Sequence, residues 1–143
     1  MPDFKRIIVP VDGSETSNKA LAAALDLARD MGGRVRLVHC LDELAYQAEY
    51  PTQLLQEARA SAQAVLNDAL ARANAAGVDA DTKLMDLSAQ RLGESIADAA
   101  RAFEADLVVV GSHGRRGIGR VLLGSGAEQI IRMASVPVLV IRS

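Results

Sequence analysis

The chain has 143 residues, of which 50% are hydrophobic and 24% are charged, and its net charge is −2 at pH 7. This length fits one domain, so we expect residues 1–143 to fold as a unit. Neither nucleic acid nor a membrane is an expected partner, because the balance of charge is not basic and no apolar run reaches the roughly 18 residues of a membrane-spanning helix. The start lacks the pattern of a signal peptide and Cys40 is the single cysteine, so we expect no internal disulfide and a cytoplasmic location.

In chain order, the first predicted elements are a strand, a helix and a second strand. The apolar run Arg6–Val11 predicts the first strand, and Ser14 follows it as a candidate N-cap of a helix. The pair Gly32-Gly33 ends this helix, and Val35–Cys40 predicts the second strand. The predicted buried face of the helix consists of Leu21, Ala24, Leu25, Ala28 and Met31.

The alternation of helices and strands continues to the end of the chain. After a helix that Gly77 ends, Ala80–Leu87 alternates polar and apolar residues, which is typical of an edge strand. Asp106–Val110 and Pro137–Ile141 are short apolar runs that predict the last two strands. The helices of this part have apolar faces formed by Ala62, Val65, Leu66, Ala69, Leu70 and Ala73, by Leu92, Ile96, Ala99, Ala100 and Phe103, and by Ala127, Ile130, Ile131 and Ala134.

Strict alternation of strands and helices predicts an α/β fold, namely a doubly wound five-stranded parallel sheet with helices on both faces. The first, second and fourth strands are almost continuously apolar, as strands covered on both sides must be. Ligands of such sheets bind beyond the carboxyl ends of the strands, where the strand order reverses. The strand ends to consider are therefore Pro10–Asp12, His39–Leu41 and Val110-Gly111.

The most informative segment runs from Gly111 to Ser125 and reads GSHGRRGIGRVLLGS. It contains the spacing Gly111-x2-Gly114-x9-Gly124-Ser125, between a predicted strand and a predicted helix. Backbone N–H groups and the positive end of a helix dipole bind phosphates in loops of this kind. Glycine would permit close approach of the phosphate and a positive φ.

Two other phosphate-binding motifs are absent from the sequence. A Walker A loop needs Gly-Lys-Ser/Thr, and the chain contains no Gly-Lys pair. The dinucleotide fingerprint needs Gly-x-Gly-x-x-Gly after the first strand, where this chain has the lone Gly13. Hydride transfer on a nicotinamide cofactor is therefore disfavoured.

The glycine motif, with four further segments, resembles the nucleotide-binding members of the universal stress protein family over the whole chain. These segments are Ile8–Glu15 before an alanine-rich helix, Val38-His39, Asp106–Gly111 and Val136–Ile141. The resemblance implies an adenine nucleotide alpha-hydrolase-like fold with strand order 3-2-1-4-5. It also implies ATP as the ligand, with any Mg²⁺ held by the phosphates, because members that do not bind ATP generally lack the glycine motif.

The same resemblance assigns roles to individual residues. Pro10 and Asp12 would border the nucleoside, with Asp12 near the ribose, and the backbone of Cys40 would recognise adenine. Val110 leads into the loop, where the expected contacts with ribose and phosphates come from Gly111, Gly114, Arg115, Arg116, Gly117, Gly124, Ser125 and Gly126. The last strand, Val136–Ile141, would lie at a sheet edge and pair with its copy in a homodimer.

Several of these residues also have simpler interpretations. Asp12 can cap the first helix together with Ser14, and Cys40 is expected to be buried and inert. His39 fits a hydrogen-bonded core histidine better than a ligand-binding group. His113 has no partner at catalytic spacing, which favours a positioning role or simple exposure over acid–base chemistry. The loop arginines Arg115, Arg116 and Arg120 would supply charge to phosphates or form a solvated face.

Three functions remain open on the sequence. The first is an ATP-binding regulatory or stress-response module that works as a homodimer, with a downstream partner that the sequence does not identify. The second is a slow ATPase or phosphoryl-transfer enzyme, which the lack of a carboxylate in the loop disfavours. The third is a protein-interaction domain with an unoccupied pocket, against which the intact glycine motif argues.

Overall fold

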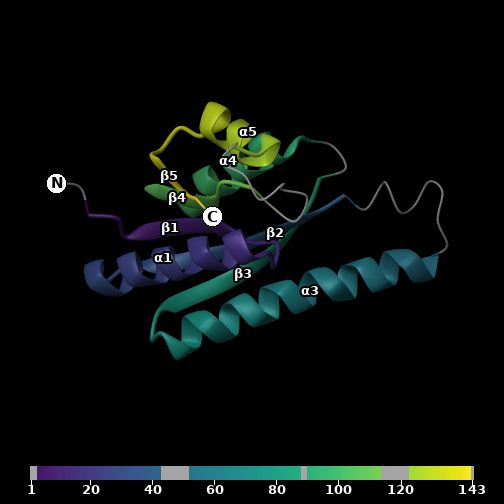
Figure 1. The fold of residues 1–143 in the computed structure, drawn as a ribbon, viewed down its shortest axis with the longest axis horizontal. Coiled ribbons are helices and arrows are strands. Elements are labelled where there is room, and N and C mark those ends of the chain that lie inside the picture. Colours follow the sequence, from purple (N-terminus) through teal and green to yellow (C-terminus); the bar gives the residue numbers. More distant parts are fainter. Residues whose placement is uncertain (1–2, 43–51, 88–89, 114–122, 143) are drawn as a thin grey trace.

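The computed structural model of the protein describes residues 3–42, 52–87, 90–113 and 123–142. Five parallel strands form one sheet in the order β3-β2-β1-β4-β5, with helices on both faces (Figure 1). The predicted doubly wound α/β fold and its strand order are therefore confirmed. In chain order the elements are β1 (Arg6–Pro10), α1 (Glu15–Met31), β2 (Arg34–Leu41), α3 (Thr52–Ala75), β3 (Asp79–Asp86), α4 (Leu92–Phe103), β4 (Leu107–Gly111), α5 (Ser125–Met133) and β5 (Val138–Ile141).

Helices α1 and α3 cover one face of the sheet, and α4 and α5 cover the other (Figure 1). Leu21 of α1 and Leu66 of α3 share the first buried cluster with Ile7, whereas Phe103 of α4 shares the second with Ile8. Successive residues of β1 thus face opposite layers, which explains why its sequence is continuously apolar. Within the described residues, no helix is long and apolar enough to cross a membrane.

The ends of α1 follow their sequence signals. Ser14 is the N-cap, and its Oγ accepts a hydrogen bond from the N–H of Ser17 at 3.1 Å. Gly32 ends the helix in the left-handed conformation, with φ of 67°, and the N–H of Gly33 donates to the carbonyl of Ala28 at 2.8 Å. Both observations match the predicted start and stop of this helix.

Three details of the predicted elements are wrong. Ile131 was expected on the buried face of α5, but it is 44% exposed, because the nine-residue helix buries a narrow stripe formed by Ala127 and Ile130. Ala134 lies outside α5 as its C-cap, with extended backbone. Asp106 precedes β4, where its carboxylate accepts the N–H groups of Lys5 and Arg6 at 2.9 and 3.1 Å.

At its start, β2 also departs from the expected apolar pattern. Arg34 and Arg36 alternate there with the buried Val35 and Leu37, and the two arginines are half-buried on the side of the sheet that carries Val38 and the α4–α5 cluster. Charged residues fit at this place because the neighbouring strand β3 supplies the matching carboxylates, Asp79 and Asp81. The expectation of continuous burial is therefore wrong for β2, in which Val35, Leu37 and Val38 are the buried residues.

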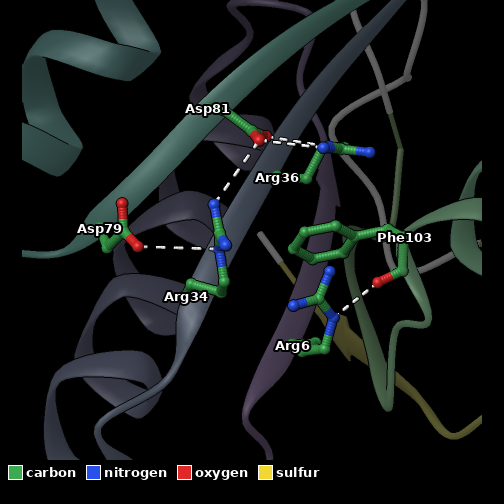
Figure 2. A network of polar contacts seen from close by, with 6 residues as sticks. All are labelled: Arg6, Arg34, Arg36, Asp79, Asp81 and Phe103. Carbon is green, nitrogen blue, oxygen red and sulfur yellow. Dashed lines mark hydrogen bonds and ion pairs between the residues drawn. The ribbon is translucent and has the colours of Figure 1, made fainter.

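Figure 2 shows the network that these arginines form at the amino-terminal end of the sheet. Arg36 donates from Nε and Nη2 to the two carboxylate oxygens of Asp81, each at 2.9 Å. The Arg36 and Arg6 guanidinium carbons lie 4.5 and 4.2 Å from the ring centroid of Phe103, within the range of cation–π attraction. The hydrogen bond from Arg36, reinforced by the charges of Arg36 and Arg34, holds the pKa of Asp81 below its usual range. The network ties β1, β2, β3 and α4 together.

Candidate ligand-binding pocket

Strands β1 and β4 separate at the carboxyl end of the sheet. Their pairing consists of Ile7 with Leu107 and Ile8 with Val108, whereas β1 stays paired with β2 as far as Pro10. Because Val11 donates its N–H to Val38 on the β2 side, the nitrogen of Pro10 faces β4. Proline has no N–H to donate there, so no ladder hydrogen bond is lost where the strands diverge. This is also the place where the strand order reverses.

A pocket of about 430 Å³ lies at this divergence, which is a size typical of small-molecule sites. Its lining includes every predicted site residue that the structure describes, namely Pro10, Asp12, Cys40, Val110, Gly111, Gly124, Ser125 and Gly126. The predicted residues Gly114, Arg115, Arg116 and Gly117, and also Arg120, lie outside the described residues. Three strand ends and the start of one helix thus meet around a single cavity.

Much of the apolar wall of the pocket was not predicted from the sequence. Val38, Leu87, Leu92 and Ile130 line it, although the helical spacing of Leu92 and Ile130 predicted ordinary core residues. Leu92 lies on α4 and Ile130 lies on α5, and these two helices pack against each other. A periodic pattern identifies the buried face of a helix but does not distinguish neighbouring side chains from a ligand.

The described glycines around the pocket are closely packed against the rest of the chain, and the positive φ that the sequence suggested for them is wrong. A Cβ on Gly111 would lie 2.8 Å from Cγ2 of Thr16, and a Cβ on Gly124 would lie 3.0 Å from the carbonyl oxygen of Ser112. Gly126 has the same role against Leu92, at 2.9 Å. None of these three has a positive φ, so they allow close contact between elements of the chain itself.

The start of α5 offers backbone donors to the pocket. Its N-cap is Gly124, which supplies no side-chain hydrogen bond, whereas the start of α1 is capped by Ser14. The first N–H groups of a helix have no partner within the helix and carry partial positive charge. Since Ser125, Gly126 and Ala127 all line the pocket, this end of it is suited to an anion.

Asp12 and His113 are both held in place by the first turn of α1. The Asp12 carboxylate accepts the N–H of Ser14 at 2.9 Å, and the N–H of Asp12 donates to Ser17 Oγ at 3.0 Å. His113 lies with Nε2 3.3 Å from Thr16 Oγ1 and Nδ1 3.3 Å from Ser112 Oγ. Asp12 therefore braces the helix cap, as the simpler interpretation predicted, while it also lines the pocket.

Cys40 presents its backbone to the pocket. The Val38 carbonyl accepts the N–H of Val11, which follows β1, and the Leu41 carbonyl accepts the N–H of Leu87, which follows β3. Successive residues of a strand direct their N–H and C=O groups to opposite sides, so those of Cys40 point to the β1 side. Because β1 ends at Pro10, they face the space beyond that strand. A neighbouring donor and acceptor are thus available at the pocket wall.

The Cys40 thiol has a different character. Burial raises its pKa to about 12, so the thiol stays protonated near neutral pH and is a poor nucleophile. This agrees with the expectation of an inert cysteine, although the residue is only half-buried.

Charged groups are few in the described part of the pocket. The described lining contains one carboxylate, that of Asp12, and two imidazoles, those of His39 and His113. It contains no lysine or arginine. Groups of three or more side chains that could hold a metal ion are likewise absent from the described residues. Attraction for an anion therefore comes from the start of α5 and, by prediction, from Arg115 and Arg116.

Comparisons with known proteins give a consistent result. A family model described as the universal stress protein family matches residues 3–142. A universal stress protein of Methanocaldococcus jannaschii is 31% identical over 143 residues, which cover 97% of this chain and 82% of that protein.

Two solved structures show the same fold. A universal stress protein family member from Burkholderia pseudomallei is 33% identical, with a TM-score of 0.79 over 99% of this chain and 98% of that one. The universal stress protein of Archaeoglobus fulgidus in complex with dAMP is 24% identical, with a TM-score of 0.76 over 98% of this chain and 99% of that one. At this identity the second likeness concerns the fold alone.

Proposed function

The chain belongs to the universal stress protein family, and we propose that it binds ATP in the pocket between the carboxyl ends of β1, β2 and β4. The adenine lies against Cys40 and the apolar wall, the ribose lies near Asp12, and the phosphates extend toward the start of α5. The predicted loop residues Gly114, Arg115, Arg116 and Gly117 complete the phosphate contacts. Any Mg²⁺ is held by the phosphates, because the described lining offers it a single carboxylate.

The observation that carries this proposal is that two complementary groups, the Cys40 backbone and the start of α5, line one cavity. The Cys40 N–H and C=O match a ring nitrogen and the 6-amino group of adenine, which are an acceptor and a donor side by side. The uncapped start of α5 matches an anion. Leu92 and Ile130 supply apolar surface in the same cavity, as the faces of a purine ring require.

Calorimetric titration with ATP, adenosine and ITP tests this function. ITP carries an oxygen where ATP has the 6-amino group. Two acceptors, this oxygen and the Cys40 carbonyl, would then face each other, so ITP should bind at least about tenfold more weakly than ATP. Adenosine should bind more weakly than ATP because it lacks the phosphates. Absence of ATP binding tighter than millimolar would refute the proposal. Mass spectrometry of small molecules released from the denatured protein would show which nucleotide it carries from the cell.

We further propose that the protein acts as a binding module and not as an efficient enzyme. Fast phosphoryl transfer requires metal ligands and a residue that orients the attacking group. In the described pocket, Asp12 is engaged with the start of α1 and lies on the nucleoside side of the proposed ligand. The alternative, a slow ATPase, predicts turnover that survives further purification, whereas we expect rates far below about 1 per second.

We also propose a cytoplasmic homodimer in which residues 1–143 form a single domain. Strand β5 lies at the edge of the sheet next to β4, and no strand among the described residues pairs with its other side. Leu139 on this strand is 38% exposed, and Met133 at the end of α5 is 44% exposed. An apolar edge strand of this kind is suited to pairing with a second copy across a two-fold axis.

A further inference from the structure

The imidazole of His39 contacts the carbonyl of Val11, the residue that directly follows β1. The N–H of Val11 donates to Val38 on β2 at 2.8 Å, and the carbonyl oxygen of Val11 lies 2.6 Å from Nδ1 of His39. A carbonyl oxygen can only accept, so Nδ1 carries the proton of this hydrogen bond. The side chain of His39 therefore donates to the main chain that leads from β1 into the pocket.

This hydrogen bond replaces one that the sheet would otherwise make. If the parallel ladder between β1 and β2 continued past Val38, the Val11 carbonyl would accept the N–H of Cys40. In the described part of the chain that carbonyl is bonded to His39, and the Cys40 N–H makes no hydrogen bond to it. The Cys40 N–H is left on the β1 side of β2, at the wall of the pocket.

We propose that His39 is a positioning residue that determines base selectivity. By occupying the Val11 carbonyl, its imidazole ends the ladder one hydrogen bond early and keeps the Cys40 N–H available to a purine. The ligand in this inference rests on the proposed nucleotide binding, whereas the state of the Cys40 amide is a property of the free protein. His39 is hydrogen-bonded, as the sequence analysis favoured, and its partner gives it a role in the site.

Two variants separate the donor from the bulk of the side chain. His39→Leu fills similar space but donates no hydrogen bond, so the Cys40 N–H becomes free to bond to Val11. His39→Asn keeps a short side chain with an N–H donor near the position of Nδ1 and serves as the conservative variant.

Amide hydrogen exchange of the ligand-free protein, followed by NMR, gives the first readout. In the wild type the Cys40 amide should exchange at least about tenfold faster than the Val38 amide, which lies within the β1–β2 ladder. His39→Leu should slow the Cys40 amide at least about tenfold, and His39→Asn should leave it fast. A protected Cys40 amide in the wild type would overturn the inference, even if His39→Leu failed to fold.

The ratio of ATP to ITP affinity gives the second readout. His39→Leu should lower this ratio about three- to tenfold, which corresponds to one hydrogen bond, while His39→Asn should retain it. Thermal unfolding of each variant shows whether the fold persists. An unchanged ratio together with an unchanged Cys40 exchange rate in folded His39→Leu would overturn the inference. Absence of ATP binding by the wild type would refute the proposed function, and the exchange rates would still decide the role of His39.

Discussion

The imidazole of His113 lies with Nε2 3.3 Å from Thr16 Oγ1, and this contact joins the end of β4 to the first turn of α1. Thr16 is buried, at 3% exposed, and its methyl group occupies the space that a Cβ on Gly111 would need. One threonine therefore contacts both Gly111, the last residue of β4, and His113 near the start of the predicted phosphate loop. Its two substituents can be tested separately.

Removal of the Thr16 hydroxyl should weaken ATP binding more than adenosine binding. In Thr16→Val the ring of His113 loses its partner on α1, so the entry to the predicted phosphate loop is less well ordered. We expect about a three- to tenfold loss of ATP affinity, the equivalent of one hydrogen bond, and adenosine affinity within about twofold of wild type. Calorimetric titration measures both affinities.

Thr16→Ser is the matched control, because it keeps the hydroxyl and removes the methyl group. It should bind ATP as the wild type does. Equal losses of ATP and adenosine affinity in Thr16→Val would contradict the assigned role and indicate general damage to the pocket.

Gly111→Ala should destabilise the fold through overpacking. The new Cβ would lie 2.8 Å from Cγ2 of Thr16 and 3.2 Å from its backbone carbonyl. Overpacking of this kind costs about 1–3 kcal/mol of the free energy of unfolding. Combining Thr16→Ser with Gly111→Ala removes the methyl group and should restore part of that loss, whereas the contact of the new Cβ with the backbone of residue 16 remains. Urea denaturation of both single variants and the double variant measures the coupling, and strictly additive effects would disprove it.

The fold was predictable because the sequence alternates strands and helices with clear ends. Ser14 and Gly32 mark α1 correctly, and the continuous apolar runs of β1 and β4 reflect burial on both faces. The strand ends that line the pocket were also predictable, because the carboxyl ends of parallel strands meet at one edge of the sheet. Resemblance to a family supplied the strand order, which the local pattern does not contain.

What the sequence did not predict depends on contacts between distant residues. Gly111 is a glycine because Thr16 approaches it, and a single sequence does not name that neighbour. The hydrogen bond of His39 to the Val11 carbonyl likewise joins two strands at a point where β1 has already ended. Arg36 interrupts an apolar strand because Asp81 faces it from β3, a pairing fixed by the sheet register.

Replacement of the Cys40 side chain should leave nucleotide affinity nearly unchanged. In the proposed complex the base contacts the backbone of Cys40, so Cys40→Ala should bind ATP within about threefold of wild type, less than one hydrogen bond is worth. The same titration checks this. A loss of tenfold or more would show that the side chain itself contacts the ligand.

The reactivity of the Cys40 thiol gives an independent check of its environment. Burial raises its pKa to about 12, so thiolate is scarce at pH 7 and iodoacetamide should react far more slowly with the folded protein than with the protein in denaturant. Labelling followed by mass spectrometry measures both rates. Similar rates in the two states would contradict the raised pKa and partial burial of the thiol.

Asp81→Asn should remove a stabilisation that depends on pH. Arg36 lowers the pKa of Asp81 in the folded protein. The ionised carboxylate therefore stabilises the fold fully above the unfolded-state pKa of about 3.9. This stabilisation is lost as the pH falls through the lower pKa of the folded state. The wild type should be more stable than Asp81→Asn by about 1 kcal/mol or less at pH 6, since water screens a half-exposed pair. The difference should shrink below about pH 4.

Urea denaturation at pH 6 and at pH 3 measures this difference. Asp26→Asn is the control, because it breaks an ion pair with Arg29 between two well-exposed side chains on α1. It should change the free energy of unfolding less than Asp81→Asn does at pH 6. A difference between wild type and Asp81→Asn that grows as the pH falls would contradict the prediction.

Proline at position 140 should convert the proposed dimer into monomers without breaking the sheet. Ile141 and Pro137 direct their carbonyls to β4, where they accept the N–H groups of Ser112 and Val108 at 2.8 and 3.0 Å. Val140 therefore directs its N–H to the unpaired edge of β5, and Val140→Pro removes a donor on that side alone. Since a two-fold axis repeats the loss, the dimer should weaken by about 1–3 kcal/mol, or about fivefold to 150-fold. Leu139→Lys should also weaken the dimer, because it places like charges at the interface. Leu54→Lys on α3, near the other edge of the sheet, is the control and should leave the dimer unchanged. Sedimentation velocity measures the association of each variant, and a dimer that survives both β5 substitutions would place the interface elsewhere.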